Sequence, residues 1–268
     1  MYPKLLHIYG PLEINSFNAA ILLGIVVFFY AALRHPGLEK LISKTDFLNI
    51  SIESALAGIL GGRVLHLISA WQEYNSFFQM ISIWNGGLSI LGAIAGIALY
   101  ALWSLKRRHL PIAALFDIAA LYAPLIHGIA RIGCFLAGCC YGCSTTMPWG
   151  ITYTNPLVAA PLNVHMHPTQ LYSSLLFFGI FIGMYLYAQR AARLGQKRPG
   201  ELSLIYLMAM SIERWFVDFF RGDRIMLIGK NHFAFFSFHQ WLALGVFISA
   251  LIAFMVLRSS PRHRYESV

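Results

Sequence analysis

The chain has 268 residues, of which 58% are hydrophobic and only 12% charged, and its mean hydropathy is +0.63. Soluble domains carry roughly 25% charged residues, so this composition excludes an ordinary soluble protein. The formal net charge of +9 comes from basic residues in short connections between apolar runs. Membrane topology explains that placement, and we expect no nucleic-acid partner.

Seven apolar segments are long enough to cross a bilayer core of about 30 Å at about 1.5 Å per residue. In chain order they are residues 16–33, 47–71, 86–105, 112–136, 169–189, 201–220 and 240–257. The sequence therefore predicts an all-α integral membrane protein that forms a single polytopic domain over residues 1–268.

Lysine and arginine are concentrated in alternate loops. Thirteen follow the first, third, fifth and last segments, whereas four lie on the other side. Positive residues favour the cytoplasm, which predicts an external N-terminus and a cytoplasmic C-terminus. Residues 138–168, rich in proline, and residues 221–239 then form an irregular outer head.

Three arginines, Arg63, Arg131 and Arg214, lie inside apolar segments. An intramembrane charge costs at least about 2.5–3.5 kcal/mol, so each must be paired or line a wet cavity. Asp218 and Arg221 follow Arg214 by four and seven residues, which predicts a cation–carboxylate–cation ladder on one helix face. The alternatives are that Asp218 only neutralises Arg214 and that Arg221 snorkels to the interface.

His127, Arg131 and Cys134 share one helix face by their i, i+4, i+7 spacing. No carboxylate lies within one turn of Arg131, and guanidinium matches phosphate oxygens, so we expect it to bind a lipid phosphate. The alternative is an arginine bonded to helix-end carbonyls. The glycines at 61–62 and 86–87 indicate either non-helical backbone lining a cavity or tight helix packing.

Together these motifs resemble the prolipoprotein diacylglyceryl transferase family over most of the chain. The motifs are Gly61-Gly62-Arg63, Gly86-Gly87-Leu88-Ser89, Arg131-Ile132-Gly133 with Gly142, His167-Pro168-Thr169-Gln170-Leu171-Tyr172, and the segment from Arg214 to Arg221. The resemblance implies a multi-pass protein of the bacterial inner membrane with a periplasmic head and active site. It also implies transfer of diacylglyceryl from phosphatidylglycerol to the cysteine thiol of a lipoprotein precursor, with release of glycerol phosphate and without a cofactor.

For the residues, the resemblance implies that Arg131 and Arg214 neutralise the leaving phosphate. His127 or His167 accepts the proton of the thiol, although His167 could instead order the outer loop. The expected substrate-binding residues are Arg63, Gly86, Gly87, Ser89, Cys134, Gly142, Gln170, Tyr172, Asp218 and Arg221. We expect no metal.

The chain departs from the family's pattern at polar positions. Leu91 lies near the place of a histidine, and Phe17 replaces a tyrosine. Cys134 and Cys139 replace an asparagine and a glutamate, Ser173 replaces an acid, and Asp218 replaces a glutamate. These changes leave open the general base and the acceptor, which is a protein thiol, a glycan or a small molecule.

All four cysteines fall between residues 134 and 143. Cys134 is either a nucleophile that holds a transient lipid adduct or an apolar filler, and a disulfide among Cys139, Cys140 and Cys143 would staple the loop. Cys140-x-x-Cys143 also suggests a thiol–disulfide enzyme or a zinc site, but both lack a second cysteine pair. A transporter is a further alternative, without repeat symmetry.

Overall fold

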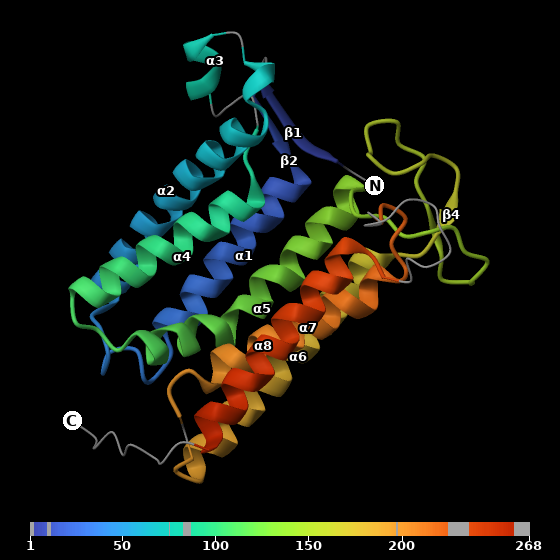
Figure 1. Cartoon of the computed structure of the whole chain (residues 1–268). Helices are drawn as coiled ribbons and strands as arrows, with labels where there is room; N and C mark the ends of the chain where they lie inside the picture. Colours follow the sequence, from blue (N-terminus) through green and yellow to red (C-terminus); the bar gives the residue numbers. More distant parts are fainter. Residues whose placement is uncertain are drawn as a thin grey trace. The chain divides into compact units, whose positions relative to one another are not determined.

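The computed structural model describes residues 3–9, 12–74, 76–82, 87–196, 198–224 and 236–259. Its helices are α1 (Ser16–Leu33), α2 (Lys44–Ser69), α3 (Phe77–Ile81), α4 (Ile90–Arg107), α5 (Ile112–Ala137), α6 (Thr169–Arg193), α7 (Glu201–Asp218) and α8 (Phe238–Ser259), with a 3₁₀ turn at Trp71–Glu73. Two antiparallel strand pairs accompany them, β1 (Lys4–Tyr9) with β2 (Leu12–Asn15) and β3 (Ile151–Thr152) with β4 (His165–Met166) (Figure 1).

Six of these helices, α1, α2, α4, α5, α6 and α8, are long and apolar enough to cross a membrane. The prediction of a mostly helical, multi-pass membrane protein is therefore confirmed. The remaining predicted segment, residues 201–220, is also a helix, α7, but its four charged residues prevent composition alone from marking it as a span. The count of seven spans and the orientation of the termini stay predictions.

Contacts within the chain define two compact units, residues 1–34 with 116–268 and residues 35–115. The prediction of a single domain is not tested by this division and stays a prediction.

In the unit of residues 35–115, α2 and α4 run side by side (Figure 1). A Cβ atom on Gly61 would lie 2.5 Å from the carbonyl oxygen of Gly92 and 3.2 Å from the Cα of Gly96. Since α2 continues without a break through Gly61 and Gly62, tight helix packing is the correct explanation of these two glycines.

Helix α4 begins at Ile90, later than the predicted boundary of residue 86. Ser89 caps this helix by accepting a hydrogen bond from the backbone N–H of Gly92. Gly87 has a φ of +77°, a left-handed conformation that ends regular structure and favours glycine. The backbone at residues 87–89 is therefore non-helical, as one of the two sequence interpretations expected.

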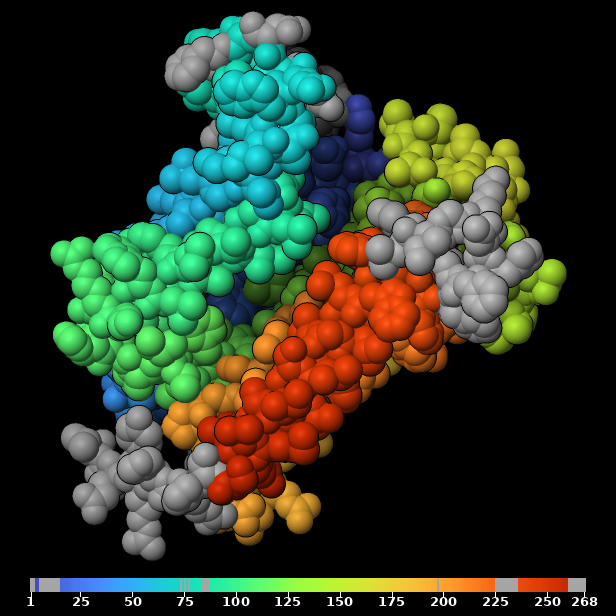
Figure 2. Space-filling view, in the orientation of Figure 1, coloured from blue at the N-terminus to red at the C-terminus, as the bar shows by residue number. Residues whose placement is uncertain are grey.

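In the other unit, α7 packs against both α6 and α8. The N-terminus of α7 is held by Asp117, whose carboxylate accepts hydrogen bonds from the backbone N–H groups of Gly200 (2.7 Å) and Ser203 (2.8 Å). Helix α1 meets α5 at Gly133, where an added Cβ would lie 2.6 Å from the Cβ of Ala20. In the space-filling view α8 lies at the surface of this unit (Figure 2). The side chain of Trp241 on this helix is exposed.

Residues 138–168 form an irregular segment with a small core of its own, Tyr153, Ala160 and Met166. The chain leaves α5 through Gly138 (φ +69°) and Cys140 (φ +56°), two left-handed residues that turn it back over the end of the helix. Of the second predicted head segment, 221–239, residues 225–235 lie outside the described residues.

Candidate active site

An arginine–carboxylate pair lies near the C-terminal end of α7. Arg214 Nη2 is 3.4 Å from Asp218 Oδ1, so the pair predicted from the i, i+4 spacing forms. Asp218 is 1% exposed, and its Oδ2 accepts a hydrogen bond from Ser237 Oγ (2.5 Å) and lies 3.5 Å from Arg224 Nε. A buried carboxylate with two cations around it fixes Arg214 in place.

The predicted ladder through Arg221 is wrong. Helix α7 ends at Asp218, so the helical spacing no longer applies to residue 221. Arg221 instead makes a bidentate pair with Asp223, with Nε–Oδ1 and Nη2–Oδ2 distances of 2.7 Å and 2.6 Å. Burial is the largest single influence and lowers the pKa of Arg221, but the hydrogen bond and charge of Asp223 together with Cys140 outweigh it, so the pKa is raised on balance. Arg224 takes the place of the second cation beside Asp218.

Arg131, on α5, makes no hydrogen bond or ion pair with any side chain in the part of the chain that the structure describes. It lies within electrostatic reach of Glu213 and Arg214 on α7. The helix-end-carbonyl alternative receives no support, because Arg131 donates no hydrogen bond to a described carbonyl. Its guanidinium is available to an anionic ligand.

Glu213 is a buried carboxylate that the sequence analysis did not identify. It is 4% exposed, accepts a hydrogen bond from Ser173 Oγ (2.5 Å), and interacts electrostatically with Arg131, Arg214 and Arg221. One indication of this carboxylate was present in the sequence, because Ser173 stands where the family that the motifs resemble has an acidic residue. In this chain Glu213, on α7, brings a carboxylate next to Ser173.

The two candidate histidines lie in different surroundings. His127 Nε2 is 2.8 Å from Tyr206 Oη, and its ring stacks on Phe177 at 4.9 Å, inside the helix bundle. His167 precedes α6, and its Nδ1 is 3.1 Å from Tyr172 Oη, which also accepts a hydrogen bond from Trp149 Nε1 (2.8 Å).

Gln170 and Gly142 connect the irregular segment to the helices. The Gln170 amide donates hydrogen bonds to the carbonyl oxygen of Cys139 (2.8 Å) and to Tyr153 Oη (3.1 Å). A Cβ on Gly142 would overlap the carbonyl oxygen of His167. Both residues, expected to bind substrate, therefore hold the backbone around residues 138–143 in place.

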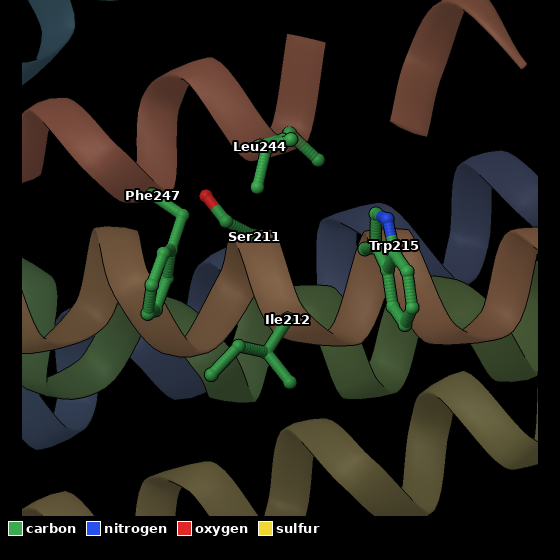
Figure 3. A pocket seen from close by; sticks show the side chains of 6 residues that line it. Ser211, Ile212, Trp215, Leu244 and Phe247 are labelled. Carbon is green, nitrogen blue, oxygen red and sulfur yellow. The ribbon is translucent and has the colours of Figure 1, made fainter. Parts of the chain in front are cut away.

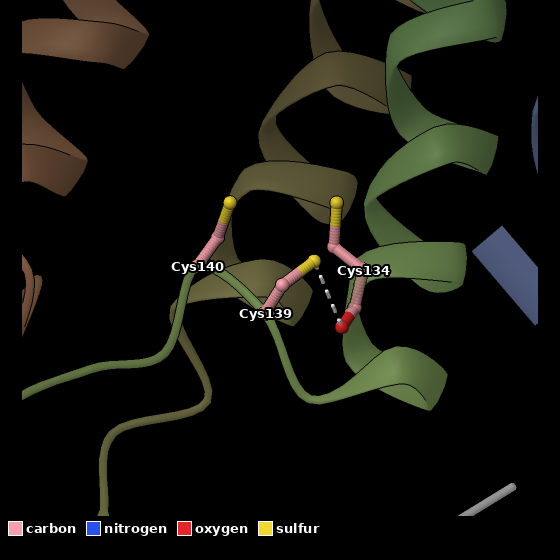
Figure 4. Close-up of side chains that lie close together, drawn as sticks. All are labelled: Cys134, Cys139 and Cys140. Atoms are coloured by element: carbon pink, nitrogen blue, oxygen red, sulfur yellow. Dashed lines mark hydrogen bonds between the residues drawn. The ribbon is translucent and has the colours of Figure 1, made fainter. Parts of the chain in front are cut away.

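All four cysteines are described and free, so the predicted disulfide staple is absent. The Sγ atoms of Cys134, Cys139 and Cys140 all lie within 4.8 Å of one another (Figure 4). This thiol cluster includes Cys134, which is buried, and excludes Cys143. Hydrogen bonds from Cys134 and Cys139, followed by the charges of Arg221 and Arg131, lower the pKa of Cys140.

The remaining predicted residues belong to the unit of residues 35–115. Arg63 is buried, and its Nε, Nη1 and Nη2 donate to the carbonyl oxygens of Met80 (2.8 Å), Gly87 (2.9 Å) and Gln79 (2.6 Å). The charge of Arg63 is thus satisfied by backbone carbonyls of the segment before α4. Ser89 caps α4, and Gly86 lies outside the described residues.

An apolar groove of about 250 Å³ runs between α7 and α8 and is lined by Ser211, Ile212, Trp215, Ala243, Leu244 and Phe247 (Figure 3). Trp215 directly follows Arg214, so the groove lies on the neighbouring face of α7. Hydrocarbon-lined space beside the Arg214 guanidinium suits a molecule with an acyl chain and an anionic headgroup.

These features define a multi-pass helical membrane protein with an internal cationic site. The sequence model of the prolipoprotein diacylglyceryl transferase family matches residues 3–256. The chain is 30% identical over 258 residues to the phosphatidylglycerol–prolipoprotein diacylglyceryl transferase of Clostridium tetani, covering 96% of this chain and 98% of that protein. It is 32% identical over 257 residues to transferase 2 of Clostridium perfringens, covering 95% of each chain. The chain belongs to the prolipoprotein diacylglyceryl transferase family.

Proposed function

We propose that this protein transfers the diacylglyceryl group of phosphatidylglycerol to the cysteine thiol of a prolipoprotein and releases glycerol phosphate. The names of its relatives describe this activity. The observation that carries the proposal is Arg131, a guanidinium that no side chain in the described part of the chain pairs, within electrostatic reach of Arg214. A phosphodiester headgroup supplies the anion that such a site needs.

In this proposal Arg131 and Arg214 hold the two free oxygens of the phosphodiester. Negative charge grows on the phosphate as the glycerol carbon–oxygen bond breaks, and fixed guanidinium groups stabilise it without reorganisation. Asp218 orients Arg214, and the groove beside Trp215 accommodates an acyl chain of the donor.

His167 is the proposed proton acceptor for the thiol. Its Nδ1 lies 3.1 Å from Tyr172 Oη, and in the proposed role Nδ1–H donates to that hydroxyl and leaves Nε2 as the basic nitrogen. This tautomer is part of the proposal. His127, bonded to Tyr206 and stacked on Phe177, is the second candidate.

The proposed topology has seven spans, with α7 as the sixth, an external N-terminus and a cytoplasmic C-terminus in the bacterial inner membrane. The excess of lysine and arginine in alternate loops supports it. Residues 138–168 and 221–239 would then form the periplasmic head of one polytopic domain, where an exported prolipoprotein is available.

The test uses the full-length protein in vesicles that contain phosphatidylglycerol with a labelled headgroup. We expect labelled glycerol phosphate to appear when a peptide that contains the acceptor cysteine of a prolipoprotein is added. The mass of a diacylglyceryl group should appear on that peptide at the same time. A matched peptide with serine in place of the cysteine should give no release. Release that requires a glycan or a small amine, and not the cysteine peptide, would overturn the proposed acceptor.

A further inference from the structure

The thiol cluster of Cys134, Cys139 and Cys140 has the dimensions of a metal site. Its sulfurs lie within 4.8 Å of one another, and the three side chains converge on one side of the loop after α5 (Figure 4). Tetrahedral Zn–S bonds of about 2.3 Å place sulfurs about 3.8 Å apart. A closure of at most about 1 Å per pair, within the reach of small χ1 changes, would surround one ion.

The backbone is built to bring these thiols together. Cys140 has a φ of +56°, a conformation that non-glycine residues keep only where the surroundings hold it. Those surroundings are on α6: Thr169 Oγ1 donates to the carbonyl oxygen of Cys140 (2.9 Å) and Gln170 Nε2 to that of Cys139 (2.8 Å). Thr169 and Gln170 are each 1% exposed, so buried polar groups fix the loop that carries two of the three sulfurs.

The charges around the cluster suit an anionic metal complex. Three thiolates around a divalent ion carry one net negative charge, and a fourth thiolate adds another. Arg131 and Arg221 both act electrostatically on Cys140 in the direction that favours a thiolate. Arg221 is also paired with Asp223, whereas Arg131 has no ion-pair partner among the described side chains. Apolar packing of neutral thiols would need neither arginine.

We propose that Cys134, Cys139 and Cys140 bind one Zn²⁺ ion and leave its fourth position open for the acceptor thiol. Three protein ligands with an open position are the pattern of catalytic zinc sites. Zinc holds a coordinated thiol as the thiolate.

The role in catalysis rests on the proposed function. The acceptor thiol binds zinc as a thiolate and gives its proton to water or to His167. Its sulfur then attacks the glycerol carbon that bears the phosphodiester oxygen. The S–C bond forms while the C–O bond breaks, and the bonding electrons leave with glycerol phosphate. The thioether product is a neutral, weaker ligand than a thiolate and leaves the metal.

The first experiment measures the metal itself. Protein purified without chelators should contain about one zinc per chain. We expect Cys134→Ser, Cys139→Ser and Cys140→Ser each to weaken zinc binding at least about 100-fold, the upper effect of losing a supporting group. Cys143→Ser, the matched control outside the cluster, should bind zinc like the wild type. Equal zinc content in all four variants would overturn the site.

Two measurements on wild-type protein keep the proposal testable if a variant fails to fold. Zinc should protect Cys134, Cys139 and Cys140, but not Cys143, from alkylation read by mass spectrometry. In cobalt-substituted protein, the cysteine peptide should shift the visible thiolate–cobalt bands, and the serine peptide should not. A disulfide within the cluster, or no zinc protection, would reject the metal site, and unshifted bands would reject the open position.

These outcomes separate the metal site from the proposed function. Zinc binding and the cobalt spectrum are measured without phosphatidylglycerol, so a protein that binds zinc and releases no glycerol phosphate would refute only the transferase role. Full turnover by metal-free protein would instead refute the zinc step and leave the transfer reaction in place.

Discussion

Arg131 is the residue on which the proposed phosphate site depends most. We expect Arg131→Ala to lower glycerol phosphate release by about 10²–10³-fold, the effect of removing one preorganised donor to a developing anion. Arg131→Lys should recover little, because an ammonium group cannot replace the planar fork. Thermal unfolding should change little, since no described side chain pairs with Arg131.

The matched control is Arg193→Ala, an exposed arginine at the end of α6, which should keep the wild-type rate. An Arg131→Ala protein with wild-type turnover would show that the headgroup binds elsewhere.

Glu213 allows a swap experiment with its partner on α6. Glu213→Ser alone should lower turnover by about 10- to 100-fold, as expected for a charged hydrogen bond of about 1.5–3 kcal/mol. The double variant Ser173→Glu/Glu213→Ser returns a carboxylate to the same place from the other helix. The turnover rate with phosphatidylglycerol should therefore be higher in the double variant than in Glu213→Ser. Equal rates in the two variants would refute the idea that a carboxylate from either helix fills the same place.

How far single residues could be predicted depended on sequence separation. The Arg214–Asp218 pair was predictable because helical period alone brings i and i+4 together. Glu213 was missed because its partner, Ser173, is forty positions away and only the packing of α6 on α7 joins them. The thiol cluster was missed for another reason: it needs the left-handed backbone at Cys140, which no local pattern for cysteine indicates.

At the scale of elements, the end of a helix decides which charges pair. Residue 221 was expected on the face of Arg214, but α7 ends at Asp218, and Arg224 reaches Asp218 from the following loop. The predicted helices were otherwise close to those observed, because apolar runs of this length have few alternatives in a bilayer. Glycine contacts between α2 and α4 had to be read from the structure, since the same glycines also fit a broken helix.

The ion pair on α7 can be tested by a double-mutant cycle. Asp218→Ala should destabilise the protein by about 3–5 kcal/mol, because it leaves buried cations uncompensated. Arg214→Ala/Asp218→Ala should recover only part of that stability, since Arg224 stays beside the vacated site. Thermal unfolding in detergent measures the stability of each variant in the cycle. Activity should remain lost in the double variant, and its return would make the pair purely structural.

For the whole molecule, the orientation depends on whether α7 crosses the bilayer. Four unpaired charges would oppose insertion by about 10–14 kcal/mol on insertion scales, which is why composition alone marks six spans. Each charge, however, has a partner. Glu201 pairs with Arg258 at 2.6 Å, Glu213 accepts from Ser173, and Arg214 pairs with Asp218. A helix whose charges are satisfied by its neighbours can span as part of the bundle.

Seven spans put the termini on opposite sides of the membrane, whereas six put them on the same side. We therefore expect a fluorescent protein fused after residue 259 to fluoresce, because that reporter folds in the cytoplasm, and alkaline phosphatase fused there to be inactive. The same phosphatase inserted within residues 154–157 of the head should be active. The matched insertion at residues 195–196, between α6 and α7, should be inactive, since the preceding basic residues hold that loop in the cytoplasm. An active phosphatase after residue 259, with an inactive one at 195–196, would mean that α7 and α8 do not both cross, and the proposed orientation would have to be abandoned.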